Sequence, residues 1–180
     1  MKRNRDSQRS RVYGWERACG ILTMPTLSLD ECQDLATRAR ARYRKAPLRV
    51  FDGRSRRRGG AHGTWAITLP RFARSSWYTL HEVAHTLVPH GAAPHGPEFV
   101  RILLDLLGAF VPSVSLADAR KKATEHRVKV ARASAVPRPL AASVVKRIES
   151  LDAAIKAKEM ELGALEEQRR ALLAAQRAAA

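Results

Sequence analysis

The feature that most constrains this chain is a pair of histidines four residues apart, His81 and His85, with Glu82 directly after the first. On an α-helix, residues four apart lie one above the other on the same face, so the two imidazole rings can reach one metal ion together. Glu82 then lies close enough to polarise a water molecule bound to that ion. The pattern therefore requires a helix, and it supplies both metal ligands and a carboxylate general base.

The surrounding residues predict that helix. Ser75 or Ser76 can cap its N-terminus, because a serine side chain accepts a hydrogen bond from the first unpaired backbone N–H groups. Apolar residues recur at helical spacing over 80–88, and Pro89 ends the pattern. The helix is thus short and mostly buried, which places its histidines at the boundary between a core and a cleft.

Four downstream residues compete to be the third ligand: His90, His95, Glu98 and Asp105. His90 follows His85 by only five residues, a short distance for a chain that must turn back over the metal. Glu98 and Asp105 fall on the next predicted helix, where a thermolysin-like enzyme keeps an acidic ligand. His95 opens a His-Gly-Pro-Glu-Phe segment, whose glycine permits a tight turn and whose proline suits a first helical turn. The residues alone leave the choice open.

The two-part motif, HEVAH and then HGPEF, resembles that of the SprT-like zinc metallopeptidases, a family that includes the Spartan proteases acting on DNA–protein crosslinks. The resemblance covers roughly residues 30–130. This chain departs from the family in having a short loop within the motif and no zinc ribbon after it, since it has only two cysteines. The resemblance implies that Zn²⁺ is bound by His81, His85 and His95, with Glu82 as the catalytic base.

The expected activity is hydrolysis of a peptide bond in a protein or peptide substrate by a zinc-activated water. The alternative is a non-catalytic nucleic-acid-binding or scaffold protein with a structural zinc site. Glu82 separates the two, because a structural site has no use for a general base and normally fills its fourth position with a protein ligand. Only three good ligands are apparent in the sequence, which favours the enzyme.

The expected fold is α+β: a small zincin-like domain with a short antiparallel or mixed sheet and an active-site helix. This domain is placed at residues 29–133, after a basic, disordered N-terminal arm at 1–28. A proline-containing linker at 134–140 leads to a helix or coiled coil at 141–180. The strand before the active-site helix is expected at the sheet edge. Elements expected in the domain are helices at 31–45, 97–110 and 116–125, strands at 48–51, 63–69 and 127–131, and an exposed loop at 54–60.

The C-terminal segment has a heptad pattern, interrupted where Lys158 and Arg169 occupy core positions. It predicts a coiled coil of moderate quality. The pattern does not choose among a homodimer, folding back on the domain and docking a partner. Its apolar heptad positions are Ile148, Leu151, Ile155, Leu162, Leu165 and Leu172.

The formal net charge is +16, from 33 Lys and Arg against 17 Asp and Glu. Residues 38–58 hold ten basic residues and one acid, and residues 120–132 hold six and one. This clustering favours a surface that contacts phosphates. No base-reading motif accompanies it, so DNA binding is expected to be largely independent of sequence. The candidate contacts are Arg54, Arg56, Arg57 and Arg58.

The cellular compartment is inferred from three further observations. The two cysteines give no pattern of a secreted, disulfide-bonded protein. There is no run of 18 apolar residues, and the basic N-terminus lacks the apolar segment of a signal peptide. The sequence therefore predicts a cytoplasmic protein without a membrane partner.

Overall fold

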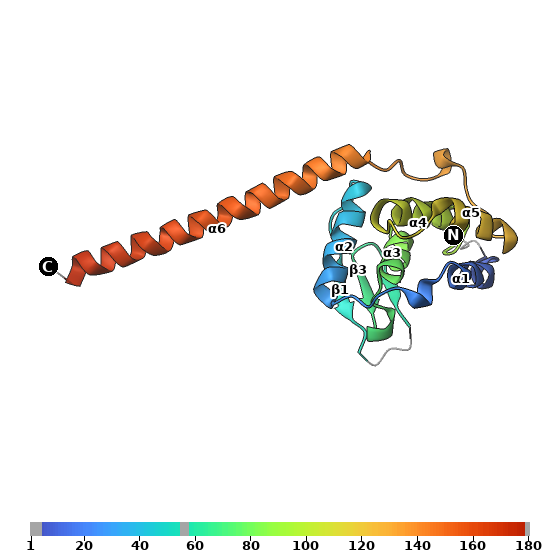
Figure 1. Cartoon of the computed structure of the whole chain (residues 1–180), viewed down its shortest axis with the longest axis horizontal. Coiled ribbons are helices and arrows are strands. Elements are labelled where there is room, and N and C mark those ends of the chain that lie inside the picture. Colours follow the sequence, from blue (N-terminus) through green and yellow to red (C-terminus); the bar gives the residue numbers. More distant parts are fainter. Residues whose placement is uncertain (1–4, 55–57, 179–180) are drawn as a thin grey trace. The chain divides into compact units, whose positions relative to one another are not determined.

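The computed structural model describes residues 5–54 and 58–178. Within these ranges the chain forms six α-helices and a three-stranded mixed sheet, which confirms the α+β class (Figure 1). The chain divides into two compact units, Met1–Leu140 and Ala141–Ala180. Each unit is described separately.

The sheet of the first unit has the order β1-β3-β2. Strand β1 (Arg49–Asp52) runs parallel to β3 (Ala66–Leu69), and β2 (Gly60–His62) runs antiparallel to it. The prediction that the strand before the active-site helix forms the sheet edge was wrong, because β3 is central and buried. The edge next to that helix is β2, a three-residue strand too short and too glycine-rich to be recognised in the sequence.

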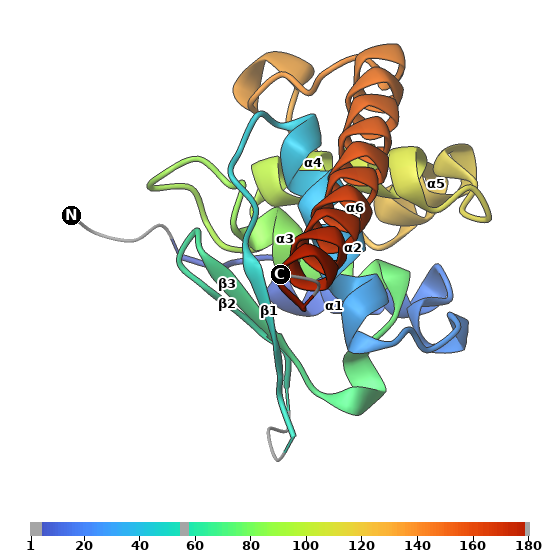
Figure 2. The same cartoon turned by 90° about the vertical axis from the view of Figure 1, so that its left-hand side faces the viewer.

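Two helices pack against the sheet, and a third packs against both of these helices (Figure 2). A capping box at Ser28 begins α2 (Leu29–Arg42), the Ser75 hydroxyl caps α3 (Ser76–His85), and proline occupies the first turn of α4 (Pro97–Phe110). The helices expected in these places are therefore confirmed. Their apolar faces meet in one core, whose largest fully buried side chains include Trp77, Phe99, Ile67, Leu69, Leu80, Leu103 and Leu107.

The N-terminal segment, predicted as a disordered arm, is instead an ordered part of the domain. Helix α1 (Arg9–Ala18) packs against the core through Val12 and Trp15, both fully buried. The Trp15 indole N–H donates to the Ala119 carbonyl at 2.8 Å. Composition misled the prediction, because exposed arginines outnumber the few apolar residues that anchor the helix. Only the first four residues of the arm lie outside the described part.

The strand expected at 127–131 is not formed, although helix α5 (Leu116–Glu125) before it is. In place of a neighbouring strand, the Gln8 side chain bonds to the backbone of this segment. The Gln8 amide donates to the Lys129 carbonyl at 3.2 Å and accepts from the Lys129 N–H at 2.9 Å. The segment is thereby tied to the N-terminal part of the domain. Short 3-10 turns lie at η1 (Ile21–Thr23), η2 (Arg71–Ala73) and η3 (Ala133–Ala135).

The second unit is one helix of 37 residues, α6 (Ala142–Ala178). The helix is confirmed, while the coiled coil and the homodimer stay predictions. No helix in the described part of the chain combines the length and the apolar character needed to cross a membrane. Four heptad residues of α6 are exposed: Leu151, Ile155, Leu162 and Leu165.

Candidate metal centre

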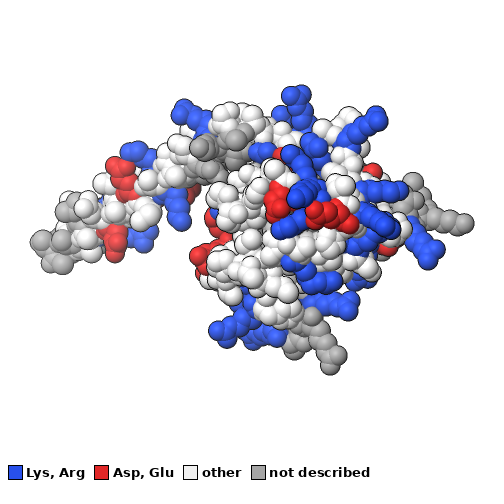
Figure 3. All heavy atoms as spheres, turned by 45° about the vertical axis from the view of Figure 1, so that its right-hand side comes forward, with Lys and Arg blue, Asp and Glu red and all other residues white. Residues whose placement is uncertain are grey.

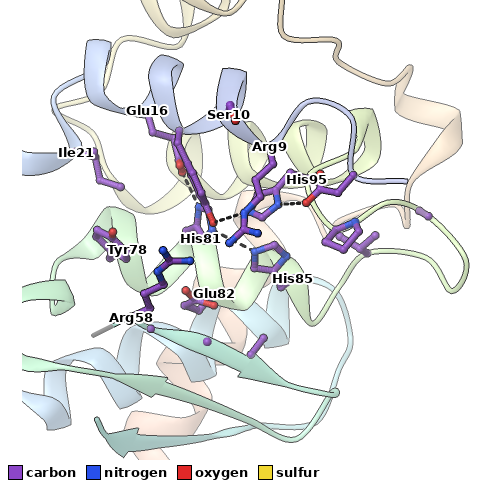
Figure 4. A pocket seen from close by; sticks show the side chains of 18 of the residues that line it. Arg9, Ser10, Glu16, Ile21, Arg58, Tyr78, His81, Glu82, His85 and His95 are labelled. Atoms are coloured by element: carbon purple, nitrogen blue, oxygen red, sulfur yellow. Dashed lines mark hydrogen bonds and ion pairs between the residues drawn. The ribbon is translucent and has the colours of Figure 1, made fainter. Parts of the chain in front are cut away.

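Three histidine side chains meet at one point of the first unit. His81 and His85 project from the last two turns of α3, and His95 comes from the loop that enters α4 (Figure 4). One ring nitrogen from each lies within 4.8 Å of the other two. The Nε2 atoms of His81 and His85 are 3.1 Å apart. This spacing suits three ligands of a single ion.

The polar atoms at this point could hold a metal ion. The Nε2 atom of His95 is buried and has no hydrogen-bond partner among the described residues. Such an atom is costly to leave unsatisfied, and native structures rarely do so without a function or a bound ion. Imidazole nitrogens are preferred ligands of zinc and of other first-row transition metals. The residues present therefore fit a metal ion held by three imidazoles.

Two carboxylates from the N-terminal segment accept hydrogen bonds from the Nδ1 atoms of two of these rings. Glu16 Oε1 lies 2.6 Å from His81 Nδ1, and Asp6 Oδ2 lies 2.8 Å from His95 Nδ1. A carboxylate at Nδ1 accepts a hydrogen bond from the proton there and leaves Nε2 free to bind a metal. The pairing thus fixes both the tautomer and the orientation of two of the three ligand rings.

Sequence reasoning missed both carboxylates, because they fall in the segment predicted to be disordered. Glu16 is only 2% exposed and also accepts a hydrogen bond from the Trp77 indole N–H at 3.1 Å. One signal was available: Glu16 follows Val12 by four residues and Trp15 by one, so it lies on the apolar face of α1. An acid on an apolar helix face needs a partner in the interior.

Glu82 lies beside the histidines at the base of a cavity, and it is 5% exposed. Burial raises the pKa of its carboxyl group; His81 opposes this effect and Glu16 reinforces it. A general base works best when its pKa lies near the working pH, so the raised value suits the role. The chain leaves room for this carboxylate at Gly59, where an added Cβ would lie 3.0 Å from Glu82 Oε1.

The pKa values of the three histidines are shifted in different directions. Burial, followed by the charges of the neighbouring imidazoles, lowers the pKa of His85 well below its ordinary value. Burial also lowers the pKa of His95, although the hydrogen bond that His95 donates to Asp6 opposes it. At His81, burial is outweighed by the charge and hydrogen bond of Glu16, so the pKa is raised. Neutral imidazole is the form that binds a metal, and burial favours it at His85 and His95.

The other candidate ligands lie outside this cluster. The Asp105 carboxylate is bound by the Arg42 guanidinium through two hydrogen bonds of 2.8 Å. His90 lines the cavity but is not among the three clustered residues, and neither is Glu98. The geometry therefore brings together the set that includes His95.

The cavity in front of the histidines has a volume of about 1640 Å³. One wall is α1, the opposite wall is the β2 edge, and the loop between α3 and α4 closes one end (Figure 4). Small-ligand sites typically measure about 300–1,000 Å³, so this cavity has room for a segment of a polymer.

The four arginines predicted to contact DNA are only partly described. Arg54 and Arg58 are exposed, and Arg58 lines the cavity. Arg56 and Arg57 lie outside the described residues. The basic cluster also contributes less to the surface than its count suggests, since Arg40 is 5% exposed and donates hydrogen bonds to the Ala46 and Thr86 carbonyls. On the face shown in Figure 3, Lys and Arg side chains are spread out and not gathered in one patch.

Comparison with known proteins gives no match to a family model, to a curated protein or to a solved structure. The resemblance to SprT-like enzymes thus rests on the two-part motif. The metal centre rests on its own geometry.

Replacing Glu16 with alanine is expected to weaken metal binding about 10- to 100-fold, the usual cost of losing a carboxylate partner of a ligand histidine. Glu16→Gln keeps a neutral acceptor oxygen for His81 Nδ1 and should lose less. Competition with a chromophoric chelator measures both affinities, and circular dichroism checks the fold. Glu125→Gln, on α5, is the matched control. Wild-type affinity in a folded Glu16→Ala variant would contradict the positioning role.

Proposed function

We propose that this chain is a zinc-dependent metallopeptidase of the SprT-like type. One observation carries the proposal: three imidazoles converge at the base of an open cavity with the Glu82 carboxylate directly beside them. His81, His85 and His95 would hold a metal ion with the cavity in front of it, and three protein ligands beside a substrate cavity are characteristic of catalytic sites. A purely structural site normally closes its fourth position with a protein ligand, and the described cluster contains no fourth.

The chemistry follows from the residues around that position. Zinc on the three histidines would act as a Lewis acid and lower the pKa of a bound water from about 15.7 toward roughly 7. Glu82 accepts a proton as water attacks the peptide carbonyl, and then passes it to the leaving amine. Burial with a raised pKa suits this carboxyl group to holding the proton between the two steps. Glu16 and Asp6 keep two of the ligand rings in place throughout.

The β2 edge provides a surface for an extended substrate. Gly60 and Ala61 of this strand line the cavity opposite α1. An edge strand can pair with a peptide as an added strand, with main-chain hydrogen bonds supplying affinity. A peptide aligned in this way would pass its scissile bond in front of Glu82.

The direct test is hydrolysis of an unstructured polypeptide, assayed with and without DNA. Cleavage should stop when a chelator removes the metal and return when zinc is restored. A scaffold protein with a structural zinc site would also lose its metal to the chelator, but it would not cleave the polypeptide even when zinc is bound. The ratio of the cleavage rates with and without DNA then determines whether DNA-bound proteins are favoured substrates.

Binding of DNA is proposed from the basic clusters, and it should be insensitive to base sequence. Each neutralised phosphate adds about 0.9 to the slope of log affinity against log salt on duplex DNA and about 0.7 on single strands. Reversing Arg54, Arg56, Arg57 and Arg58 to Glu should therefore lower affinity and flatten this slope, with zinc content unchanged. Fluorescence anisotropy over a salt series measures both quantities.

A matched control reverses the same number of charges in α6, where acidic residues are interspersed. The affinity of that variant should change less than the affinity of the arginine-loop variant. Wild-type protein that shows no salt-dependent DNA binding at about 50 mM salt, where phosphate contacts are strong, would contradict the proposal. The control positions are Lys156, Lys158, Arg169 and Arg170.

A further inference from the structure

The cavity wall carries three arginines that the metal centre does not use: Arg9, Arg17 and Arg58. Arg9 and Arg17 belong to α1, and Arg58 lies just before β2. Figure 4 shows the Arg9 guanidinium beside the histidine cluster, and Arg58 reaches into the same cavity from the β2 side. Within the described part of the chain, none of the three forms a salt bridge with a carboxylate.

The acidic groups of the cavity, by contrast, are already engaged. Asp6 pairs with His95 and Glu16 with His81, at 2.8 Å and 2.6 Å. Glu82 is buried next to the same cluster. A bound divalent cation would add two positive charges of its own at that point. The charge that an incoming ligand meets in the open part of the cavity is therefore positive.

Two of the arginines start from backbone next to the candidate site. Arg58 directly precedes Gly59, whose backbone lies so close to Glu82 that an added Cβ would come within 3.0 Å of Oε1. Arg9 lies over the Tyr13 ring at 5.5 Å and donates to its hydroxyl at 3.4 Å. The two arginines therefore line opposite walls of the cavity, Arg9 on α1 and Arg58 beside β2.

We propose that these arginines select peptide substrates with Asp or Glu side chains on both sides of the scissile bond. This inference rests on the proposed peptidase function and names the substrate class of that site. Ile21, Leu22 and Val88 supply apolar lining in the same cavity, which suits an apolar residue in the same substrate. Segments rich in Lys or Arg are repelled from the cavity, and these include the chain's own basic stretches.

Binding can be measured apart from cleavage in zinc-loaded Glu82→Gln, which keeps the cavity but lacks the base. The probes are two peptides with one apolar centre, flanked in one by glutamates and in the other by lysines. The acidic peptide should bind at least about tenfold more tightly, and the preference should shrink as salt screens the charges. The wild-type enzyme should show the same preference in kcat/KM.

Charge reversal in the cavity is the decisive variant. Arg9→Glu combined with Arg58→Glu should abolish or invert the preference between the two peptides, while zinc content remains that of the wild type. The matched control combines Arg71→Glu with Arg120→Glu, two exposed positions outside the cavity lining. It changes the net charge equally and should leave the preference as it is.

Equal affinity for the two peptides, or an equal effect of both double variants, overturns the inference. So does a single-stranded oligonucleotide that binds through Arg9 and Arg58 in a protein that does not discriminate between the peptides. Selective binding of the acidic peptide with no cleavage by wild-type protein has a different meaning. It supports the role of the arginines and contradicts the proposed peptidase.

Discussion

Replacing any one of His81, His85 and His95 with alanine is expected to remove the bound metal, so that zinc falls from about one ion per chain toward none. Each variant leaves only two imidazoles, and nothing else in the described cluster can replace the third. Metal content after purification and buffer exchange, measured by mass spectrometry, is the readout. Loss of metal should abolish hydrolysis as well.

His90→Ala is the matched control, because His90 lines the same cavity without joining the cluster. That variant should keep its zinc. If His95→Ala kept full zinc while Glu98→Ala or Asp105→Ala lost it, the ligand set would be wrong, and so would the resemblance that first suggested it. Apo protein should still be checked for folding, since metal binding and folding are coupled.

Glu82→Gln is expected to reduce peptide hydrolysis about a hundredfold to ten-thousandfold, the usual cost of losing a general base. The amide has nearly the same shape as the carboxylate but cannot accept the proton. Zinc content and the unfolding transition should remain those of the wild type, since Glu82 is not among the clustered ligands. Initial rates on an unstructured protein substrate measure the effect.

The matched control is Glu98→Gln, which makes the same chemical change on the first turn of α4 and should keep its activity. Full activity in zinc-loaded Glu82→Gln would mean either that the water is activated by another group or that the cleavage comes from a contaminant. Whether the activity follows the protein through a further chromatographic step distinguishes these cases.

The part of the site that lies on one helix could be predicted from the sequence. Serine capping, apolar spacing and the four-residue interval of His81 and His85 all depend on local geometry, and α3 bears them out. His95 was one of several candidates on the basis of residue chemistry. The family resemblance favoured it, and the structure brings it to the other two histidines.

The supporting half of the site could not be predicted in this way. Asp6 and Glu16 contact histidines that follow them by 89 and 65 residues, and no local pattern records such a separation. The basic composition around them indicates disorder, although three buried residues of α1, Val12, Trp15 and Glu16, pack the helix against the domain. The same lack of tertiary information placed the sheet edge at the wrong strand.

Charge counts were misleading for a related reason. Arg40 and Arg42 belong to the most basic stretch of the sequence, yet their side chains are hydrogen-bonded within the domain, Arg40 to backbone carbonyls and Arg42 to Asp105. Arg58 belongs to the same stretch and lines the cavity. Arginines of one basic stretch therefore lie in three kinds of environment: hydrogen-bonded within the domain, exposed to solvent, or lining the cavity. Only the fold distinguishes them.

The central claim is that a metal at the three histidines makes this cavity a site of peptide hydrolysis. Its most direct test is a zinc titration of metal-free protein, in which the initial rate of hydrolysis is recorded at each addition. The rate should rise linearly and level off at about one zinc per chain, as expected for a single catalytic ion. Zinc that binds with this stoichiometry while the rate stays at background would contradict the claim.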